Sequence, residues 1–311
     1  MLLGPCLSEV GFEVLYWVPM LRRLAERHGV DPSRVVAVSR GGAETWYEGI
    51  ADRYVDVLDL YGLEEYRARL DARRAETASE KQATLTEFDR EILERARHHI
   101  GLDDPIVVHP SLMVTRLRYY WAGETDIRVV RRNTGFKRLN AGPVDDIDLP
   151  GEYAAVKPYF SSCFPDTDEN RRFVHDLVAR LAASMPVVVL PGGFGLDDHG
   201  ECEVPDMDGV VRIQTGITAR NNLSVQTRIV AGAQALFTTY GGFAYVGSMA
   251  GVDTTGLYAE ANFNRRHLAV ARLAALEIGA PEISLLDVAR GADRVALPEA
   301  TRDYPAAQSR R

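Results

Sequence analysis

The sequence predicts an α/β protein built from two Rossmann-like, doubly wound halves that face each other across a cleft. The chain has 311 residues, which suits two domains of roughly 150 residues each. In both halves, runs rich in β-branched residues alternate with segments of helical period, and this alternation is typical of parallel sheets with crossover helices. A content of 46% hydrophobic and 26% charged residues fits a globular protein.

The first half is expected to hold four strands and three helices. The strands lie near Met1–Gly4, Val35–Ser39, Tyr54–Leu58 and Ile106–His109, and the helices over Phe12–Arg27, Glu44–Ala51 and Leu112–Trp121. A highly charged stretch at about 63–100 keeps one narrow apolar face of helical spacing, formed by Phe88, Ile92, Leu93, Ala96 and Ile100. We therefore expect a helical insertion there, either a solvated helix or a lid or acceptor-docking element.

A domain boundary is predicted near Leu139–Gly151, where Gly, Pro and Asp occur without periodicity. The predicted domains are 1–145 and 146–311. In the second domain we expect a further doubly wound sheet. Its strands are Tyr153–Lys157, Val187–Leu190, Val210–Ile213, Ala235–Thr239, Thr254–Tyr258 and Ile283–Leu286, and its helices are Glu169–Ala183, Leu223–Gly232, Phe243–Ala250 and Asn264–Glu277.

Composition excludes several classes of function. A net charge of −8 argues against general nucleic-acid binding, which needs clustered Lys and Arg. The three cysteines are odd in number and lack CxxC spacing, so neither a disulfide framework nor a zinc site is expected. The opening segment is apolar but carries Glu9 and Glu13, which predicts neither a signal peptide nor a membrane span. A cytoplasmic protein fits best.

A glycine turn gives the strongest local signal. A short apolar strand ends at Tyr240, Gly241 and Gly242 follow, and a helix begins near Phe243. The N-terminus of a helix offers free N–H groups and the positive end of a dipole, and glycine lets an anion approach the backbone, so this turn can bind phosphate. A plain strand-to-helix turn explains the glycines equally well. If the turn binds phosphate, Gly242→Val should weaken diphosphate binding and leave the fold intact.

Two more strand ends carry candidate donor-binding groups. The strand ending at Lys157 precedes Ser161 and Ser162, and a lysine with nearby hydroxyls can hold a diphosphate as it leaves. The alternative is a surface lysine. Gly192 and Gly193 follow the strand Val187–Leu190, where backbone can lie against a base or ribose, or form a simple turn. A Lys157→Ala variant is expected to lose turnover at an unchanged melting temperature.

The first domain supplies candidate groups for an acceptor. Glu9 and Glu13 lie at the start of the first helix, where a carboxylate can take the proton of an attacking hydroxyl or merely suit the helix dipole. Arg40 and Gly41 follow the second strand and can line the acceptor site. His109 ends a strand and can bind an acceptor hydroxyl, although a structural role is the commoner one for such a histidine.

Two segments resemble the bacterial heptosyltransferases, the glycosyltransferase family 9-like group of the GT-B class. One is FEVLYWVPMLRRL, in which Glu13 opens the helix and Pro19 follows six positions later. The other is NNLSVQTRIVAGAQALFTTYGGFAYVGSMAGVDTTGLYAE, which is similar to the family's late helix, strand, donor-phosphate turn, helix and strand. The chain departs from the family in having Glu13 for the usual Asp, and Tyr240–Phe243 for an Asp-Ser/Thr-Gly-Pro turn.

The resemblance implies an inverting, metal-independent glycosyltransferase of cell-surface glycan or glycoconjugate synthesis. The domain 1–145 would hold the acceptor and 146–311 the nucleoside-diphosphate sugar, which is a co-substrate and not a resident cofactor. Glu13, with Glu9 in reserve, would be the base, and Arg228 and Glu260 secondary donor contacts. The acceptor would be a glycan, a lipid-linked group or a small molecule, and peripheral contact with a membrane stays open. The alternatives are a nucleotide-sugar epimerase of the same fold and a non-catalytic nucleotide-sugar-binding paralogue.

Overall fold

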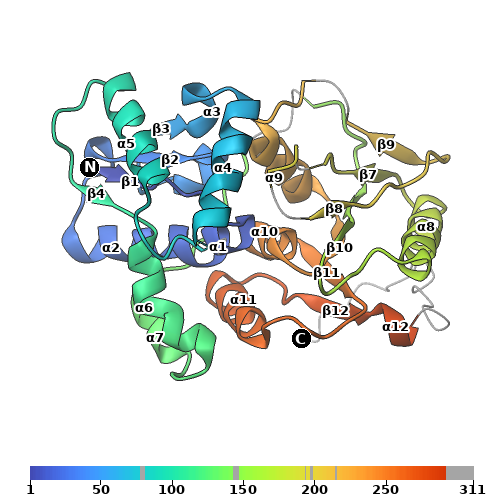
Figure 1. Ribbon diagram of the computed structural model, residues 1–311. Helices are drawn as coiled ribbons and strands as arrows, with labels where there is room; N and C mark the ends of the chain where they lie inside the picture. Colours follow the sequence, from blue (N-terminus) through green and yellow to red (C-terminus); the bar gives the residue numbers. More distant parts are fainter. Residues whose placement is uncertain (78–80, 143–146, 193, 197–198, 214–215, 292–311) are drawn as a thin grey trace, which may run out of the picture.

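The protein contains two parallel sheets, one in each half of the chain (Figure 1). The computed structural model describes residues 1–77, 81–142, 147–192, 194–196, 199–213 and 216–291. Within these residues the first sheet has the strand order β3-β2-β1-β4 and the second has β12-β11-β10-β5-β7-β9. Every neighbouring pair in both sheets is parallel. The predicted α/β class with two parallel sheets is confirmed.

The first sheet is short, and its strands alternate with helices. The strands are β1 (Leu2–Leu3), β2 (Val36–Ser39), β3 (Arg53–Asp56) and β4 (Val107–Val108). The helical segments around them are α1 (Val10–Phe12), η1 (Glu13–Trp17), α2 (Val18–His28), η2 (Pro32–Arg34), η3 (Ala43–Tyr47), α3 (Val57–Leu60), α6 (Ser111–Ala122) and α7 (Arg128–Asn133). The helix expected over Glu44–Ala51 is instead the short 3₁₀ turn η3. The strand expected to reach Leu58 ends at Asp56, because the Asp56 carboxylate caps α3 by accepting from the N–H of Leu58.

The first long helix contains a π-helical turn. Segments α1, η1 and α2 follow one another without a break, and in η1 the N–H of Val18 donates to the carbonyl of Glu13. Pro19 comes next and has no N–H to donate, so the regular pattern of backbone hydrogen bonds in the helix is interrupted at this place. The helix ends at Gly29, whose φ of 58° is readily adopted only by glycine and a few polar residues.

The charged insertion consists of α4 (Leu63–Thr77) and α5 (Glu87–His99), and a buried polar network fixes it to the first sheet. The side-chain amide of Gln82 donates to the carbonyl of Pro5 and to Asp89, and the guanidinium of Arg73 lies 3.6 Å from Asp89. Burial alone would raise the pKa of Asp89, but the neighbouring His109 side chain and hydrogen bonds from Thr86 lower it overall. The insertion is therefore docked on the domain by specific contacts.

The second half has the larger sheet. Its strands are β5 (Ala154–Lys157), β7 (Val187–Val189), β9 (Val210–Arg212), β10 (Ala235–Thr239), β11 (Asp253–Tyr258) and β12 (Ser284–Asp287). Its helices are α8 (Asp168–Ala182), α9 (Asn222–Gly232), α10 (Gly242–Ala250), α11 (Arg265–Ile278) and α12 (Val288–Gly291). An antiparallel pair, β6 (Tyr159–Phe160) with β8 (Gly200–Glu201), was not expected from the sequence.

The two halves share a continuous apolar core. Buried residues of both sheets belong to one cluster, and α1 lies beside α10 at the centre of the molecule (Figure 1). The carbonyl of Gly41 accepts from the N–H groups of Leu223 and Ser224, so the first half caps α9 of the second. The predicted boundary at 145/146 lies outside the described residues. None of the helices in the described residues combines enough length with enough apolar character to span a bilayer.

Candidate active site

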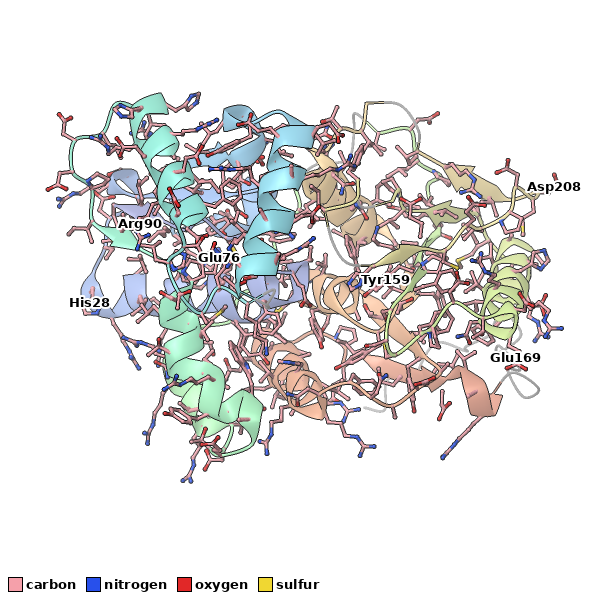
Figure 2. The ribbon with its side chains drawn as sticks, viewed as in Figure 1. His28, Glu76, Arg90, Tyr159, Glu169 and Asp208 are labelled. Carbon is pink, nitrogen blue, oxygen red and sulfur yellow. The ribbon has the colours of Figure 1, made fainter. Side chains whose placement is uncertain are left out.

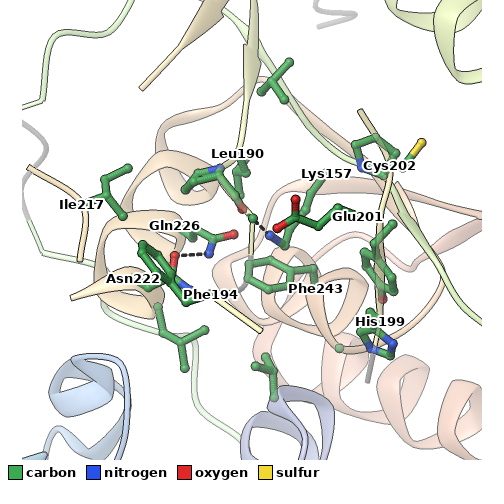
Figure 3. A pocket seen from close by; sticks show the side chains of 18 of the residues that line it. Lys157, Leu190, Phe194, His199, Glu201, Cys202, Ile217, Asn222, Gln226 and Phe243 are labelled. Carbon is green, nitrogen blue, oxygen red and sulfur yellow. Dashed lines mark hydrogen bonds between the residues drawn. The ribbon is translucent and has the colours of Figure 1, made fainter. Parts of the chain in front are cut away.

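A cavity of about 540 Å³ lies at the carboxyl ends of β5, β7 and β9 (Figure 3). Ligands of open α/β sheets bind at this edge. The second half supplies most of its walls, from the ends of these strands, from α9 and from the start of α10. The first half closes one side with Glu9, Val10 and Gly11. The cavity therefore lies where the two halves meet.

Lys157 lines this pocket at the end of β5, as the sequence predicted for the strand end. It is not a surface lysine, because the residue is only 8% exposed. Its ammonium donates to the carbonyl of Pro191 (2.7 Å) and lies 4.4 Å from the centre of the Phe243 ring. A charged group with these buried contacts also stabilises the fold. The expectation that Lys157→Ala leaves the melting temperature unchanged does not fit this geometry.

The glycine turn contributes only its helical end to the pocket. Gly242 and Phe243 line the cavity, whereas Tyr240 and Gly241 do not. The Tyr240 ring packs on Phe263 with centres 4.4 Å apart, and burial raises the pKa of Tyr240 to about 12.

Gly242 also forms part of the contact between the halves. A Cβ atom on Gly242 would lie 2.9 Å from the backbone nitrogen of Gly11. Packed backbone atoms cannot move aside to relieve such a contact as the end of a flexible side chain can. The expectation that Gly242→Val leaves the fold intact is therefore wrong for this packing.

Glu13 and Glu9 have different surroundings. Glu13 is fully buried, and its Oε1 accepts from the hydroxyls of Ser39 (2.5 Å) and Tyr47 (2.7 Å). Burial raises the pKa of Glu13, and the Arg40 guanidinium, 3.8 Å away, partly offsets this. Glu13 is not part of the pocket wall, contrary to the expectation that it faces the cleft. Glu9 is half-buried at the N-cap of α1 and lines the pocket.

Several predicted donor contacts lie away from the cavity. Ser161 and Ser162 belong to a turn closed by the bridge between Ser161 and Phe164, and neither lines the pocket. Arg228 lies on α9 but also outside the lining. Glu260 lines a separate hollow of about 660 Å³ together with Glu169, at the outer edge of the second half (Figure 2). These positions do not support a direct donor contact for any of the four predicted residues.

The remaining predicted residues divide between the pocket and the interior. Gly192 lines the pocket, and Gly193 lies outside the described residues. Arg40 is buried against Glu13, and Gly41 packs on Leu223.

His109 belongs to the network of the insertion. Its Nδ1 accepts from the N–H of Ser111, and its Nε2 lies 3.6 Å from Asp89. Like Arg40 and Gly41, His109 does not line the pocket and has a structural role here.

The sequence reasoning missed two polar side chains of the pocket. Asn222 and Gln226 are four residues apart on α9, so they share one face of the helix, and both line the cavity. This spacing was visible in the sequence, but nothing there indicated which face meets a ligand. In the described residues, no three His, Cys, Asp or Glu side chains are grouped in a way that suits a metal ion.

The insertion also reaches the pocket region from the first half. The guanidinium of Arg67 on α4 donates to the carbonyl of Phe194, and Arg74 donates to that of Leu196 (3.0 Å). Phe194 lines the pocket and has a φ of 57°, a backbone conformation uncommon outside glycine. Helix α4 thus holds part of the segment that follows β7 beside the pocket.

No protein-family model matches the chain, and neither does any curated protein. Among solved structures, the glycosyl transferase family 9 protein from Veillonella parvula is 14% identical and covers 94% of this chain and 87% of its own, with a TM-score of 0.46. The ADP-heptose heptosyltransferase II of E. coli is 11% identical and covers 92% and 89%, with a TM-score of 0.46. A UDP-N-acetylglucosamine 2-epimerase from Methanocaldococcus jannaschii is 10% identical and covers 96% and 92%, with a TM-score of 0.37. The matches include the group that the first helix and the late segment resemble.

Proposed function

We propose that the protein transfers a sugar from a nucleoside-diphosphate donor to a hydroxyl acceptor in this pocket. One observation carries the proposal: a single cavity brings together the buried ammonium of Lys157, the N-terminus of α10 and the carboxylate of Glu9 from the opposite half. The ammonium and the helix N-terminus can bind an anion, and the carboxylate can accept a proton. Groups of these two kinds in one pocket are what transfer with a diphosphate leaving group requires.

Each group has a defined task in the proposed reaction. As the bond between the sugar and the diphosphate breaks, negative charge grows on the leaving phosphate oxygen. Lys157 and the first N–H groups of α10 stabilise this charge. Glu9 accepts the proton of the acceptor hydroxyl as its oxygen attacks the anomeric carbon. Attack on the face of the anomeric carbon opposite the leaving diphosphate would give inversion, and no step needs a metal ion.

The test is a product analysis on the whole protein. Purified protein is incubated with ADP-, UDP-, GDP- and CDP-sugars, with and without hydroxyl acceptors, and nucleoside diphosphate and sugar products are separated. We expect release of a nucleoside diphosphate that rises on addition of an acceptor and yields a glycoside. A nucleotide-sugar with altered stereochemistry would instead identify an epimerase. Binding of a nucleotide-sugar without any turnover would identify a non-catalytic binding protein, and both outcomes would overturn the proposal.

A further inference from the structure

The pocket contains a buried hydrogen-bond acceptor that has no partner in the part of the chain that the structure describes. Gln226 is fully buried on α9, and its Nε2 donates to Oδ1 of Asn222 at 2.6 Å. Its Oε1 has no hydrogen-bond partner among the described residues. Figure 3 shows this oxygen on the side of the amide that points away from Asn222. Gln226 lines the cavity, so this buried, unpaired oxygen belongs to the cavity wall.

An unpaired amide oxygen in the interior is unfavourable, so its presence calls for an explanation. The hydrogen bond with Asn222 fixes the orientation of the Gln226 amide. The amide nitrogen is used in this bond, and the amide oxygen is left without a partner at the cavity wall. A ligand that supplied an N–H or O–H group would complete the hydrogen bonding of this residue. A site of this kind rejects analogues that lack the donor, because the oxygen then stays unpaired.

The chemistry of the oxygen limits what part of a nucleotide-sugar can bind it. The oxygens of an ionised diphosphate are acceptors and cannot donate to it. A base N–H can, and so can a hydroxyl of the ribose or of the transferred sugar. The apolar lining of the pocket includes Leu190, Ile213, Ile217 and Leu223. Apolar side chains of this kind suit the faces of a flat heterocycle better than a hydroxylated ring.

We propose that Gln226, positioned by Asn222, recognises the nucleobase of the donor and sets the nucleotide preference. This inference rests on the proposed function and deepens it, since it assigns the part of the ligand that gives specificity. The amide oxygen accepts from an N–H at the edge of the base. Lys157 and α10 meet the diphosphate, which all the nucleotides share, so they do not discriminate among bases.

The test compares Gln226→Leu with Gln234→Leu, the same change at an exposed glutamine outside the pocket. Calorimetry measures binding of ADP, UDP, GDP, CDP, their 2′-deoxy forms and inorganic pyrophosphate. We expect the parent to prefer one base. Gln226→Leu should bind that nucleotide about 10-fold more weakly and lose most of the preference, as expected for one lost hydrogen bond in a closed site. Pyrophosphate binding and the Gln234→Leu variant should match the parent.

Two results would overturn the assignment to the base. One is an unchanged affinity and base preference in Gln226→Leu. The other is a preserved base preference with lost discrimination between ribose and deoxyribose. Gln226→Met, unbranched like glutamine, repeats the test if the Leu variant does not fold. If the parent binds no nucleoside diphosphate, the proposed function itself fails, whereas normal binding by an indiscriminate parent would reject only this inference.

Discussion

Replacing Lys157 by Met tests whether one buried ammonium both stabilises the fold and binds the donor. Methionine keeps the unbranched stem and removes the charge. The change deletes the donor to the Pro191 carbonyl and the contact with the Phe243 ring. A lost charged hydrogen bond costs about 1.5–3 kcal/mol and a cation–π contact about 0.5–2 kcal/mol, but release of a buried charge offsets part of this. We expect a net loss of about 1–3 kcal/mol.

This loss has a modest thermal effect. A chain of 311 residues shifts its melting temperature by roughly 1–2 °C per kcal/mol, so Lys157→Met should melt about 2–5 °C lower than the parent. Its affinity for nucleoside diphosphates should also fall, by about 10- to 100-fold, since a charge-assisted contact with phosphate contributes about 1.5–3 kcal/mol. Thermal melts and calorimetric titration with ADP, UDP, GDP and CDP measure the two effects.

Lys137→Met is the matched control, because the Lys137 side chain is 54% exposed and lies outside the pocket. Lys137→Met should change neither the melting temperature nor the affinity for nucleoside diphosphates appreciably. A Lys157→Met protein that melts lower but binds every nucleoside diphosphate as the parent does would refute the reasoning. Lys157 would then only hold the segment at Pro191 in place.

Four further substitutions test other parts of the molecule. Glu9→Gln should lower kcat by about 10²–10⁴-fold at similar donor affinity, because it removes the proposed base. Glu13→Gln should mainly lower the melting temperature, because Glu13 is buried. A stable Glu13→Gln protein with the larger loss of turnover would reverse this assignment. Gly242→Val should destabilise the fold, since its side chain meets the backbone of Gly11, and an unchanged urea midpoint would contradict that packing. Burial raises the pKa of Asp56 from 3.8 to about 6, so its contribution to stability is full below pH 3.8 and is lost as the pH rises through 6. The parent should lose about 1 kcal/mol more than Asp56→Asn between pH 5 and 7.5 in urea titrations, and parallel curves would refute this.

The second sheet was predictable because buried parallel strands are short apolar runs of β-branched residues. The strand Ala235–Thr239 has the predicted bounds, and the helix after it begins at Gly242, one residue from the prediction. The pair β6 and β8 was not predictable from such runs. Its strands are two residues each and about 40 residues apart in the sequence, so only the folded chain brings Tyr159 next to Glu201.

The sequence by itself determined the alternation of strands and helices, and with it that Lys157 ends a strand and Gly242 follows one. The carboxyl ends of parallel strands lie at one edge of a sheet, so these residues were bound to come near each other. Only the tertiary structure shows which of the two carboxylates lines the pocket. Glu9 is the N-cap of α1 and lines it, whereas Glu13 meets Ser39 one turn later.

Asn222 and Gln226 show the same division between what the sequence and what the tertiary structure determine. The sequence placed Asn222 and Gln226 on one face of a helix, because residues four apart lie one turn from each other. The sequence could not show which side of α9 faces the cavity, because that depends on the sheet beneath the helix and on the first half that caps it through Gly41. Periodicity is a local property of the chain, whereas the exposure of a polar atom to a ligand depends on contacts between residues far apart in the sequence.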